Sequence, residues 1–150
     1  MIRGGLLPLP CLVLGACLLA AAASAEEAPR KFYVADIKAA TTRYIENSED
    51  GRGLFGLEDD KTGEPLELRF VKIHDPVRVI DARTYFACTD FSVPGEEGKL
   101  YDIDFWLRPA GDVLEVYRVR VHKEPRRSLL YGWYKHPRYT FVDDEVVELY

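Results

Sequence analysis

Cysteine is scarce in this chain of 150 residues, and its positions exclude a fold held together by disulfide bridges. Two of the three cysteines, Cys11 and Cys17, lie in an apolar N-terminal stretch that we expect to be removed. Cys88 is then the single cysteine of the remaining domain, which cannot form an internal disulfide. The domain must therefore be stabilised by its apolar core, which suits an exported bacterial protein better than a disulfide-dense secreted one.

Catalytic and cofactor motifs are also missing from the sequence. The three histidines are far apart, and there is no Cys-x-x-Cys pair or His-x-x-x-His pair. Such short spacings are what identify most metal and cofactor sites in a sequence. We therefore predict no catalytic residue and no cofactor from motifs.

Positive charge is neither abundant nor concentrated. The chain has 20 lysines and arginines against 25 aspartates and glutamates, a net charge of −5. Proteins that bind nucleic acid use a concentrated basic face to contact phosphates. We therefore do not expect nucleic acid as a partner, and an acidic chain does not favour anionic membranes.

The N-terminus has the order of an export signal. Arg3 gives a short basic start, an apolar run extends from Leu6 to Ala23, and Ala23-Ser24-Ala25 is a small-x-small cleavage site. Two glutamates follow at once. We therefore expect residues 1–25 to be a cleaved signal peptide, and residues 26–150 to form one domain that is periplasmic or secreted.

The same stretch has two membrane-anchored interpretations. A transmembrane helix needs roughly 20 apolar residues, and Pro8 and Pro10 interrupt this one, so we expect no span in the mature chain. Leu14-Gly15-Ala16-Cys17 resembles a bacterial lipobox, in which the cysteine is lipidated and becomes the new N-terminus. Because the apolar run continues after Cys17, we favour cleavage after residue 25 and release of the domain. A lipid anchor at Cys17 is the alternative.

The mature chain begins with a helical pattern. Over residues 32–49, the apolar side chains recur at spacings of three and four and form one stripe. The stripe comprises Val34, Ile37, Ala40, Tyr44 and Ile45. Asp36 is a candidate cap, and Asp50-Gly51 with Gly53 predicts the end of the helix.

The remainder has the alternation of β-strands separated by turn-forming residues. We expect a hairpin joining about 54–58 to 65–73, and further strands near 83–92, 101–107 and 117–122. Residues 124–135 are expected to be a loop, and residues 139–150 either strand or helix. Because consecutive strands at hairpin spacing pair antiparallel, we predict an α+β fold with the N-terminal amphipathic helix packed on a 4–6-stranded antiparallel meander sheet.

One helix across a curved antiparallel sheet is similar to the cystatin-like and NTF2-like α+β architecture. The segments Tyr85–Phe91 and Tyr101–Trp106, followed by Val121-His122-Lys123, resemble blocks of an uncharacterised family of small exported bacterial proteins. This resemblance would cover most of the mature chain. It implies no activity, and likeness of fold alone does not transfer a function.

Three single residues can supply metal ligands: His74, Cys88 and His122, with Asp75, Asp90 or Asp104 as additional oxygen donors. Imidazole, thiolate and carboxylate are suitable ligands for zinc or copper. The residues are scattered singly on separate segments, however, so their spacing is weak evidence. The favoured interpretation is that Cys88 is a small buried apolar residue and that the histidines are polar residues at strand ends.

Cys88 is also a candidate nucleophile, with His74 or His122 as its base. A thiolate needs an electropositive, partly exposed setting. Asp90 lies two residues away, and a carboxylate there would raise the pKa of the thiol and oppose its activation. We therefore do not predict nucleophilic catalysis.

Asp102 and Asp104 share one face of a predicted strand and can in principle divide acid and base roles. The following predicted strand has basic residues at alternate positions, which would place them on the same face of the sheet as the two aspartates. They are Arg118, Arg120 and His122. Opposite charges across neighbouring strands are an ordinary stabilising arrangement. The favoured interpretation is therefore an exposed ladder of charge pairs without chemistry.

Arginine and large aromatic residues gather near the C-terminus. Such residues are enriched at protein interfaces. The candidates for partner binding are Arg126, Arg127, Tyr131, Trp133 and Tyr134. The alternative is a loop whose aromatic side chains dock on the core.

Two classes of function remain. The favoured one is an exported, non-catalytic binding or assembly module of the bacterial cell envelope, which binds an envelope protein or a small ligand. The alternative is a small enzyme or ligand carrier with a pocket between helix and sheet, lined by Tyr85, Phe105 and Tyr117.

Overall fold

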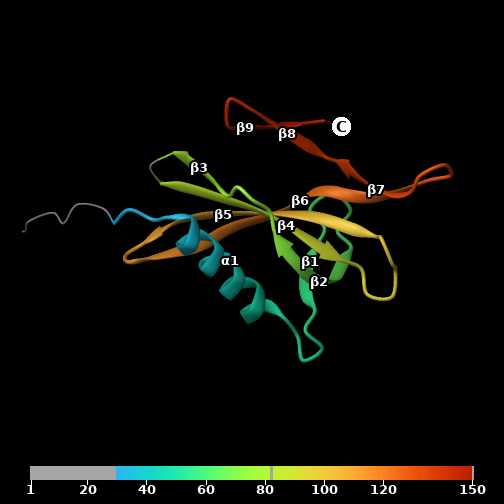
Figure 1. Ribbon diagram of the computed structural model, residues 1–150, viewed down its shortest axis with the longest axis horizontal. Coiled ribbons are helices and arrows are strands. Elements are labelled where there is room, and N and C mark those ends of the chain that lie inside the picture. The colour runs from blue at the N-terminus through green and yellow to red at the C-terminus, as the bar shows by residue number, and fades with distance from the viewer. Residues whose placement is uncertain (1–29, 82, 150) are drawn as a thin grey trace, which may run out of the picture.

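The computed structural model describes residues 30–81 and 83–149 (Figure 1). The signal peptide, the cleavage site and the lipid anchor predicted above lie outside these residues. The elements are α1 (Val34–Ser48), β1 (Phe55–Glu58), β2 (Pro65–Ile73), β3 (Arg78–Asp81), β4 (Thr84–Ser92), β5 (Leu100–Ala110), β6 (Val113–Ser128), β7 (Gly132–Pro137), β8 (Tyr139–Val142) and β9 (Glu145–Glu148).

Helix α1 begins and ends where local polar groups satisfy its backbone. The carboxylate of Asp36 accepts a hydrogen bond from the backbone N–H of Tyr33 at 2.8 Å, which caps the first turn. After Ser48, the Asp50 carboxylate accepts backbone hydrogen bonds from Arg52 and Leu54 at 2.8 and 3.1 Å. The predicted helix and its termination are thus confirmed to within two residues.

The buried stripe of α1 is narrower than the sequence suggests. Ile37, Ala40 and Ile45 are buried, as expected, and Thr41 joins them by donating its hydroxyl to the Ile37 carbonyl. Val34 and Tyr44, which the sequence places on the same stripe, are 52% and 36% exposed.

The strands form a mainly antiparallel sheet, and the predicted α+β class is confirmed. The order is β1-β2-β4-β5-β6-β7, with β3 paired to the other half of β4. In the part of the chain described, this sheet has seven strands, because β3 and β7 add to those expected. β8 and β9 form a separate two-stranded sheet.

The main sheet is covered on both faces. On one face, α1 packs over a core that includes Ile37, Phe55, Phe91, Phe105 and Val121. On the other, a smaller cluster joins Phe86 and Trp106 of the sheet to Tyr139 of β8. Figure 1 shows α1 on one side of the sheet and the β8–β9 hairpin on the opposite side. Because the β8–β9 hairpin covers this second face, polar residues on it are buried.

The C-terminal prediction needs correction. Residues 124–135 are not a loop: β6 continues to Ser128, and β7 pairs with it from Gly132 onward. Residues 139–148 form the β8–β9 hairpin, whose turn residues Asp143 and Asp144 have φ of 50° and 63°. Two consecutive residues of positive φ are typical of the tight turns that suit a twisted hairpin.

No helix in the described segments is long and apolar enough to cross a membrane.

Candidate functional site

Three aspartates and Cys88 occupy the face of β4 and β5 that points away from α1. We call Asp90, Asp102 and Asp104 the carboxylate cluster. The register places Cys88 opposite Asp104 and Asp90 opposite Asp102. Asp102 and Asp104 are completely buried, and Asp90 is 6% exposed. Buried carboxylates are costly unless they are paired or bind a cation, so each member of this cluster requires a partner.

The predicted exposed ladder of charge pairs is therefore wrong. Asp104 does lie opposite Arg120 in the register. Arg120, however, directs its guanidinium to Asp60 and Glu148, each at 2.8 Å. The sequence pattern cannot show this, because the covering β8–β9 hairpin and the β1–β2 turn supply both the burial and the competing acids.

Two lysines neutralise two members of the carboxylate cluster. Lys135 of β7 lies 2.8 Å from Asp90 and 2.5 Å from Asp102, and Lys123 of β6 lies 2.9 Å from Asp102. Burial alone would raise the pKa of Asp90, but hydrogen bonds, that from Lys135 foremost, hold it at about 2. The sequence pattern indicates neither lysine, because it predicts a loop at Lys135 and ends the preceding strand at His122, one residue before Lys123.

An irregularity in β6 brings His122 to the cluster. Asp102 pairs with Lys123 and Ile103 with Val121, so His122 is an extra residue between the two pairs. A β-bulge of this kind re-aims a side chain. The Nδ1 atom of His122 lies 3.9 Å from Cys88 Sγ and 3.3 Å from Asp104 Oδ2.

Tyr139 of β8 covers this corner. Its hydroxyl donates to Asp104 Oδ2 at 2.7 Å, and its ring stacks on His122 with centroids 4.7 Å apart and an angle of 18°. Burial, together with the charge of Asp104, raises the pKa of Tyr139, so the hydroxyl stays a proton donor.

His74 lies on the other side of Cys88. Its Nε2 atom is 2.9 Å from Asp90, and its backbone N–H donates to the Cys88 carbonyl at 2.8 Å. The predicted metal candidates thus converge on Cys88, in two groups whose ligand atoms lie within 4.8 Å of one another: His74, Cys88, Asp102 and Cys88, Asp104, His122. Asp75 is not among them, because it is exposed and pairs with Lys38 on α1 at 2.5 Å.

Cys88 is not in a setting that activates a nucleophile. Its pKa is raised, first by burial and then by the charge of Asp104. The direction agrees with the sequence prediction, although the nearest carboxylate belongs to Asp104 rather than Asp90. A thiol in this setting stays protonated at neutral pH in the absence of a metal.

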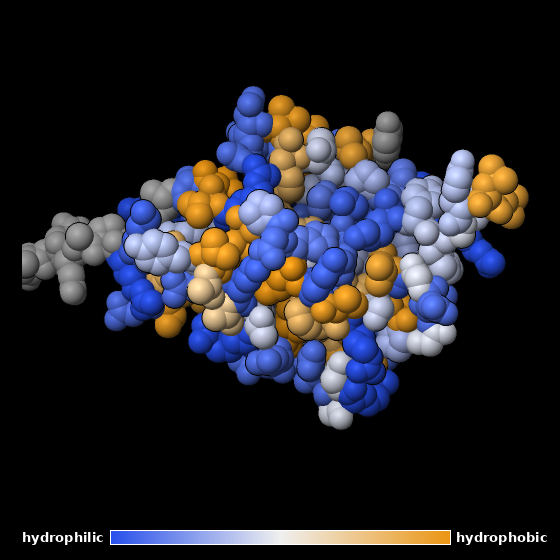
Figure 2. All heavy atoms as spheres, viewed as in Figure 1, coloured by the Kyte–Doolittle hydropathy of each residue, from blue (hydrophilic) through white to orange (hydrophobic). Residues whose placement is uncertain are grey.

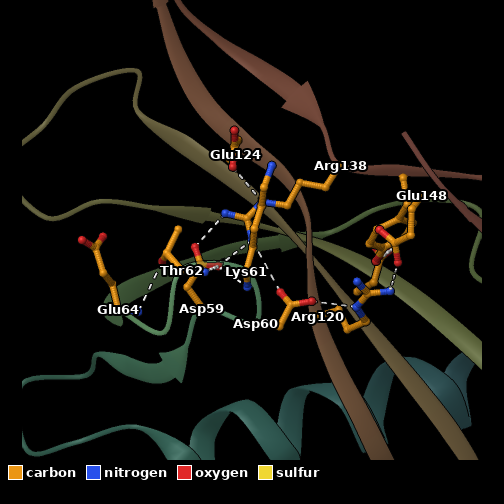
Figure 3. A network of polar contacts seen from close by, with 11 residues as sticks. Asp59, Asp60, Lys61, Thr62, Glu64, Arg120, Glu124, Arg138 and Glu148 are labelled. Carbon is orange, nitrogen blue, oxygen red and sulfur yellow. Dashed lines mark hydrogen bonds and ion pairs between the residues drawn. The ribbon is translucent and has the colours of Figure 1, made fainter. Parts of the chain in front are cut away.

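A second polar network, which the sequence prediction missed, joins the β1–β2 turn to the end of β7 (Figure 3). Arg138 is 6% exposed and donates two parallel hydrogen bonds to Asp59 at 2.6 and 2.7 Å. Its Nε atom donates to Glu124 at 2.7 Å. These hydrogen bonds lower the pKa of Asp59 to about 2. Asp59 and Glu124 both have Arg138 as a basic partner, so we assign the network a structural role.

The predicted partner-binding residues lie on the hairpin formed by β6 and β7. The hairpin tip, residues Leu129, Leu130 and Tyr131, has exposures of 105%, 84% and 82%. Figure 2 shows hydrophobic side chains at this end of the molecule, where the hairpin projects in Figure 1. A depression of about 460 Å³ beside the tip is lined by Arg127, Ser128, Tyr131 and Tyr134.

Arg126 and Trp133 are more constrained than the other candidates. The guanidinium of Arg126 forms an ion pair with Glu124 at 2.8 Å. The ring of Trp133 lies under the Lys99 ammonium, 5.1 Å from its centroid, and is partly buried. Among the candidates, Tyr131 thus projects from the exposed tip, whereas Trp133 packs against Lys99 of the β4–β5 turn.

A groove does exist between helix and sheet, but the expected aromatic residues do not line it. Tyr85 and Phe105 are buried in the core, and Tyr117 is 44% exposed beneath the guanidinium of Arg108. The groove, about 520 Å³, is lined by Ala40, Arg43, Tyr44, Asn47, Ala110, Val113, Leu114, Glu115 and Val116.

Comparison of the chain with models of protein families, with curated proteins and with solved structures gives no match. The resemblance to an exported bacterial family therefore stays a prediction, and functional inference rests on the geometry above.

Proposed function

We propose that this domain is a non-catalytic binding module of an exported protein, and that it docks a partner through the β6–β7 hairpin tip. The observation that carries the proposal is the exposure of Leu129, Leu130 and Tyr131. Solvent-exposed apolar residues that stand next to one another are typical of interaction sites. Export itself rests on the sequence of residues 1–25.

The neighbouring depression supports a particular chemistry for the proposed partner. Arg127 lines it and forms no ion pair within the described residues, whereas Arg126 is held by Glu124. Tyr131 and Tyr134 supply aromatic surface with hydroxyl groups. A segment that presents a carboxylate beside an apolar side chain fits this combination, since arginine binds carboxylates bidentately and tyrosine anchors interfaces.

The free edge of β7 extends the same surface. In the described part of the main sheet, β7 pairs with β6 alone, so its outer edge has backbone groups without a strand partner. An extended peptide can add to such an edge while its side chains reach the depression. The partner is therefore an extended acidic–apolar segment of another protein.

Selection from a library of short random peptides displayed on phage tests this proposal. Peptides selected on the unaltered domain are expected to be acidic and apolar. They should bind the triple variant Leu129→Ser, Leu130→Ser, Tyr131→Ser at least about tenfold more weakly, a loss of about 1.4 kcal/mol. The matched control is Val71→Ser with Val79→Ser, since both valines are exposed and line neither the depression nor the groove beside α1.

Two results would overturn the proposal. One is selection of peptides that bind the triple variant as well as the unaltered domain. The other is concentration-dependent dimerisation, measured by analytical ultracentrifugation, that the triple variant abolishes, because the tip would then bind a second copy of this chain.

The groove beside α1 supports a second candidate function, a carrier of small anionic ligands. Arg43 lines the groove and forms no ion pair in the described segments, whereas Glu115 is engaged by Arg108 at 3.7 Å. The volume is within the range of small-molecule sites. Binding of a fatty acid such as laurate, lost in Arg43→Gln and kept in Arg83→Gln, would favour this candidate over the first.

A further inference from the structure

Cys88, Asp104 and His122 bring three kinds of metal ligand together from three neighbouring strands. Cys88 is on β4, Asp104 is opposite it on β5, and the bulge in β6 directs His122 toward both. Their ligand atoms lie within 4.8 Å of one another. Sulfur, oxygen and nitrogen from these side chains are all ligands that zinc accepts.

The spacing agrees with one tetrahedral ion. With bonds of about 2.3 Å to sulfur and about 2.1 Å to nitrogen or oxygen, ligand atoms at tetrahedral angles are roughly 3.4–3.6 Å apart. The observed distances from His122 Nδ1 are 3.3 Å to Asp104 Oδ2 and 3.9 Å to Cys88 Sγ. Both distances are within a few tenths of an ångström of the tetrahedral values, and all three ligand atoms lie within 4.8 Å of one another.

An independent observation indicates that a cation is needed here. Asp104 is fully buried, and its Oδ1 atom has no hydrogen-bond partner within the described residues. No lysine or arginine of these residues forms an ion pair with it, in contrast to Asp90 and Asp102. His122 would compensate this charge only with a protonated imidazole. Beside a neutral imidazole the buried carboxylate is uncompensated and costly, and a bound divalent ion would compensate it.

The other group of possible ligands around Cys88 is already satisfied. Asp102 is held by Lys123 and Lys135, and His74 is held by Asp90. An ion there would have to displace ammonium groups that already neutralise the carboxylates. The Asp104 side of Cys88 is therefore the favoured position.

Tyr139 supports the ligands from β8. Its hydroxyl donates to Asp104 Oδ2 and orients the carboxylate, and its ring stacks on His122 and fixes the imidazole plane. Outer groups that orient ligands in this way are a regular part of metal sites.

We infer that Cys88, Asp104 and His122 form a binding site for one zinc-class divalent ion, with water in the fourth position. Binding replaces the thiol proton of Cys88 with the metal–sulfur bond and releases that proton to solvent. The neutral imidazole of His122 binds through Nδ1, and Asp104 binds through one oxygen.

Cobalt(II) replaces zinc as a spectroscopic probe in the test. The full domain, expressed without an affinity tag and freed of metal with a chelator, is titrated with Co²⁺. One ion per chain is expected, with a thiolate-to-cobalt charge-transfer band. Zn²⁺ should abolish the band by displacement and should raise the melting temperature of the domain.

Variants locate the ion. Cys88→Ser should lose the charge-transfer band, and His122→Gln should bind at least about tenfold more weakly. His136→Gln, on β7, and His74→Gln are the controls and should bind as the unaltered domain does. Asp104→Asn keeps an acceptor for Tyr139 and removes the unpaired charge, so it should fold without metal and lose the stabilisation by zinc.

The inference fails if the unaltered domain shows no stoichiometric band. It also fails if His74→Gln abolishes binding while His122→Gln preserves it, because the ion would then occupy the other group. If His122→Gln does not fold, Asp104→Asn decides: stabilisation by zinc equal to that of the unaltered domain overturns the site.

Discussion

Arg138 and Asp59 are 79 residues apart in the chain, yet they meet in the interior through two parallel hydrogen bonds of 2.6 and 2.7 Å. The pair attaches the β1–β2 turn to the start of the β8–β9 hairpin (Figure 3). The same turn is attached a second time, through Asp60 and Arg120. The cover of the polar face is thus held in place by charge pairs as well as by Tyr139 and Phe141.

Arg138→Met is expected to reduce the free energy of unfolding by about 3–5 kcal/mol, because it leaves the buried Asp59 without its cation. Urea unfolding measures this loss. Arg83→Met, at an exposed arginine, is the control and should change the free energy by about 0.5 kcal/mol or less. Equal losses in the two variants would contradict a specific role for the pair. Adding Asp59→Leu to Arg138→Met should recover part of the stability.

Stability should fall in acid because of Asp59. Its pKa is about 2 in the folded protein, lowered from 3.8 chiefly by hydrogen bonds from Arg138. The unfolded chain therefore takes up a proton first as the pH falls below about 4, so the contribution of Asp59 is complete above that pH and is lost toward pH 2. The contribution is about 2 kcal/mol.

The measurement compares urea unfolding of the unaltered domain and Asp59→Asn between pH 7 and pH 2.5. The difference in free energy should shrink over the acid end of this range. Glu97→Gln, at an exposed glutamate, is the control variant. A difference for Asp59→Asn that does not vary with pH would show that the carboxylate is not ion-paired in solution.

Local patterns allowed the helix and the first strands to be predicted. The apolar stripe located α1, and the turn-rich residues 59–63 located the hairpin of β1 and β2. β3 escaped prediction because its four residues show little alternation and pair with only part of β4. β7 escaped because Pro125 and the surrounding charged residues concealed the continuation of β6.

The candidate site was less predictable than the fold. Its geometry depends on the strand register in β6 and on the β8–β9 hairpin that covers this face of the sheet. His74, Cys88 and His122 have suitable chemistry, but their convergence depends on the bulge at His122, which no residue pattern marks. The burial of Asp104 depends on Tyr139, which lies 35 residues away. A strand face with alternating charges looks the same in sequence whether solvent or a second hairpin covers it.

The packing of α1 on the sheet can be tested at two positions of the same helix. Ile37 is completely buried, whereas Val34 is 52% exposed. Ile37→Ala should lower the free energy of unfolding by about 2–5 kcal/mol through lost burial and a residual cavity. Val34→Ala should change it by less than about 0.5 kcal/mol. A comparable loss at Val34 would mean that α1 contacts the sheet with a different face.

Lys135 and Lys72 provide a matched test of the carboxylate cluster. Both ammonium groups approach Asp90, but Lys135 lies 2.8 Å from it and also 2.5 Å from Asp102, whereas Lys72 lies 3.8 Å away with its side chain 66% exposed. Lys135→Met leaves two buried carboxylates with reduced compensation and is expected to lower the free energy of unfolding by about 2–4 kcal/mol. Lys72→Met removes a solvent-screened charge and should lower it by less than about 1 kcal/mol.

High salt should further distinguish the stability effects of the two lysine substitutions, because screening weakens exposed ion pairs more than buried ones. In 1 M sodium chloride the small effect of Lys72→Met should disappear, while most of the effect of Lys135→Met persists. If both effects vanish together, the carboxylate cluster is open to solvent. The β8–β9 hairpin would then not be the cover that buries Asp102 and Asp104, and the charge-pair ladder predicted from the sequence would be the better description of this face.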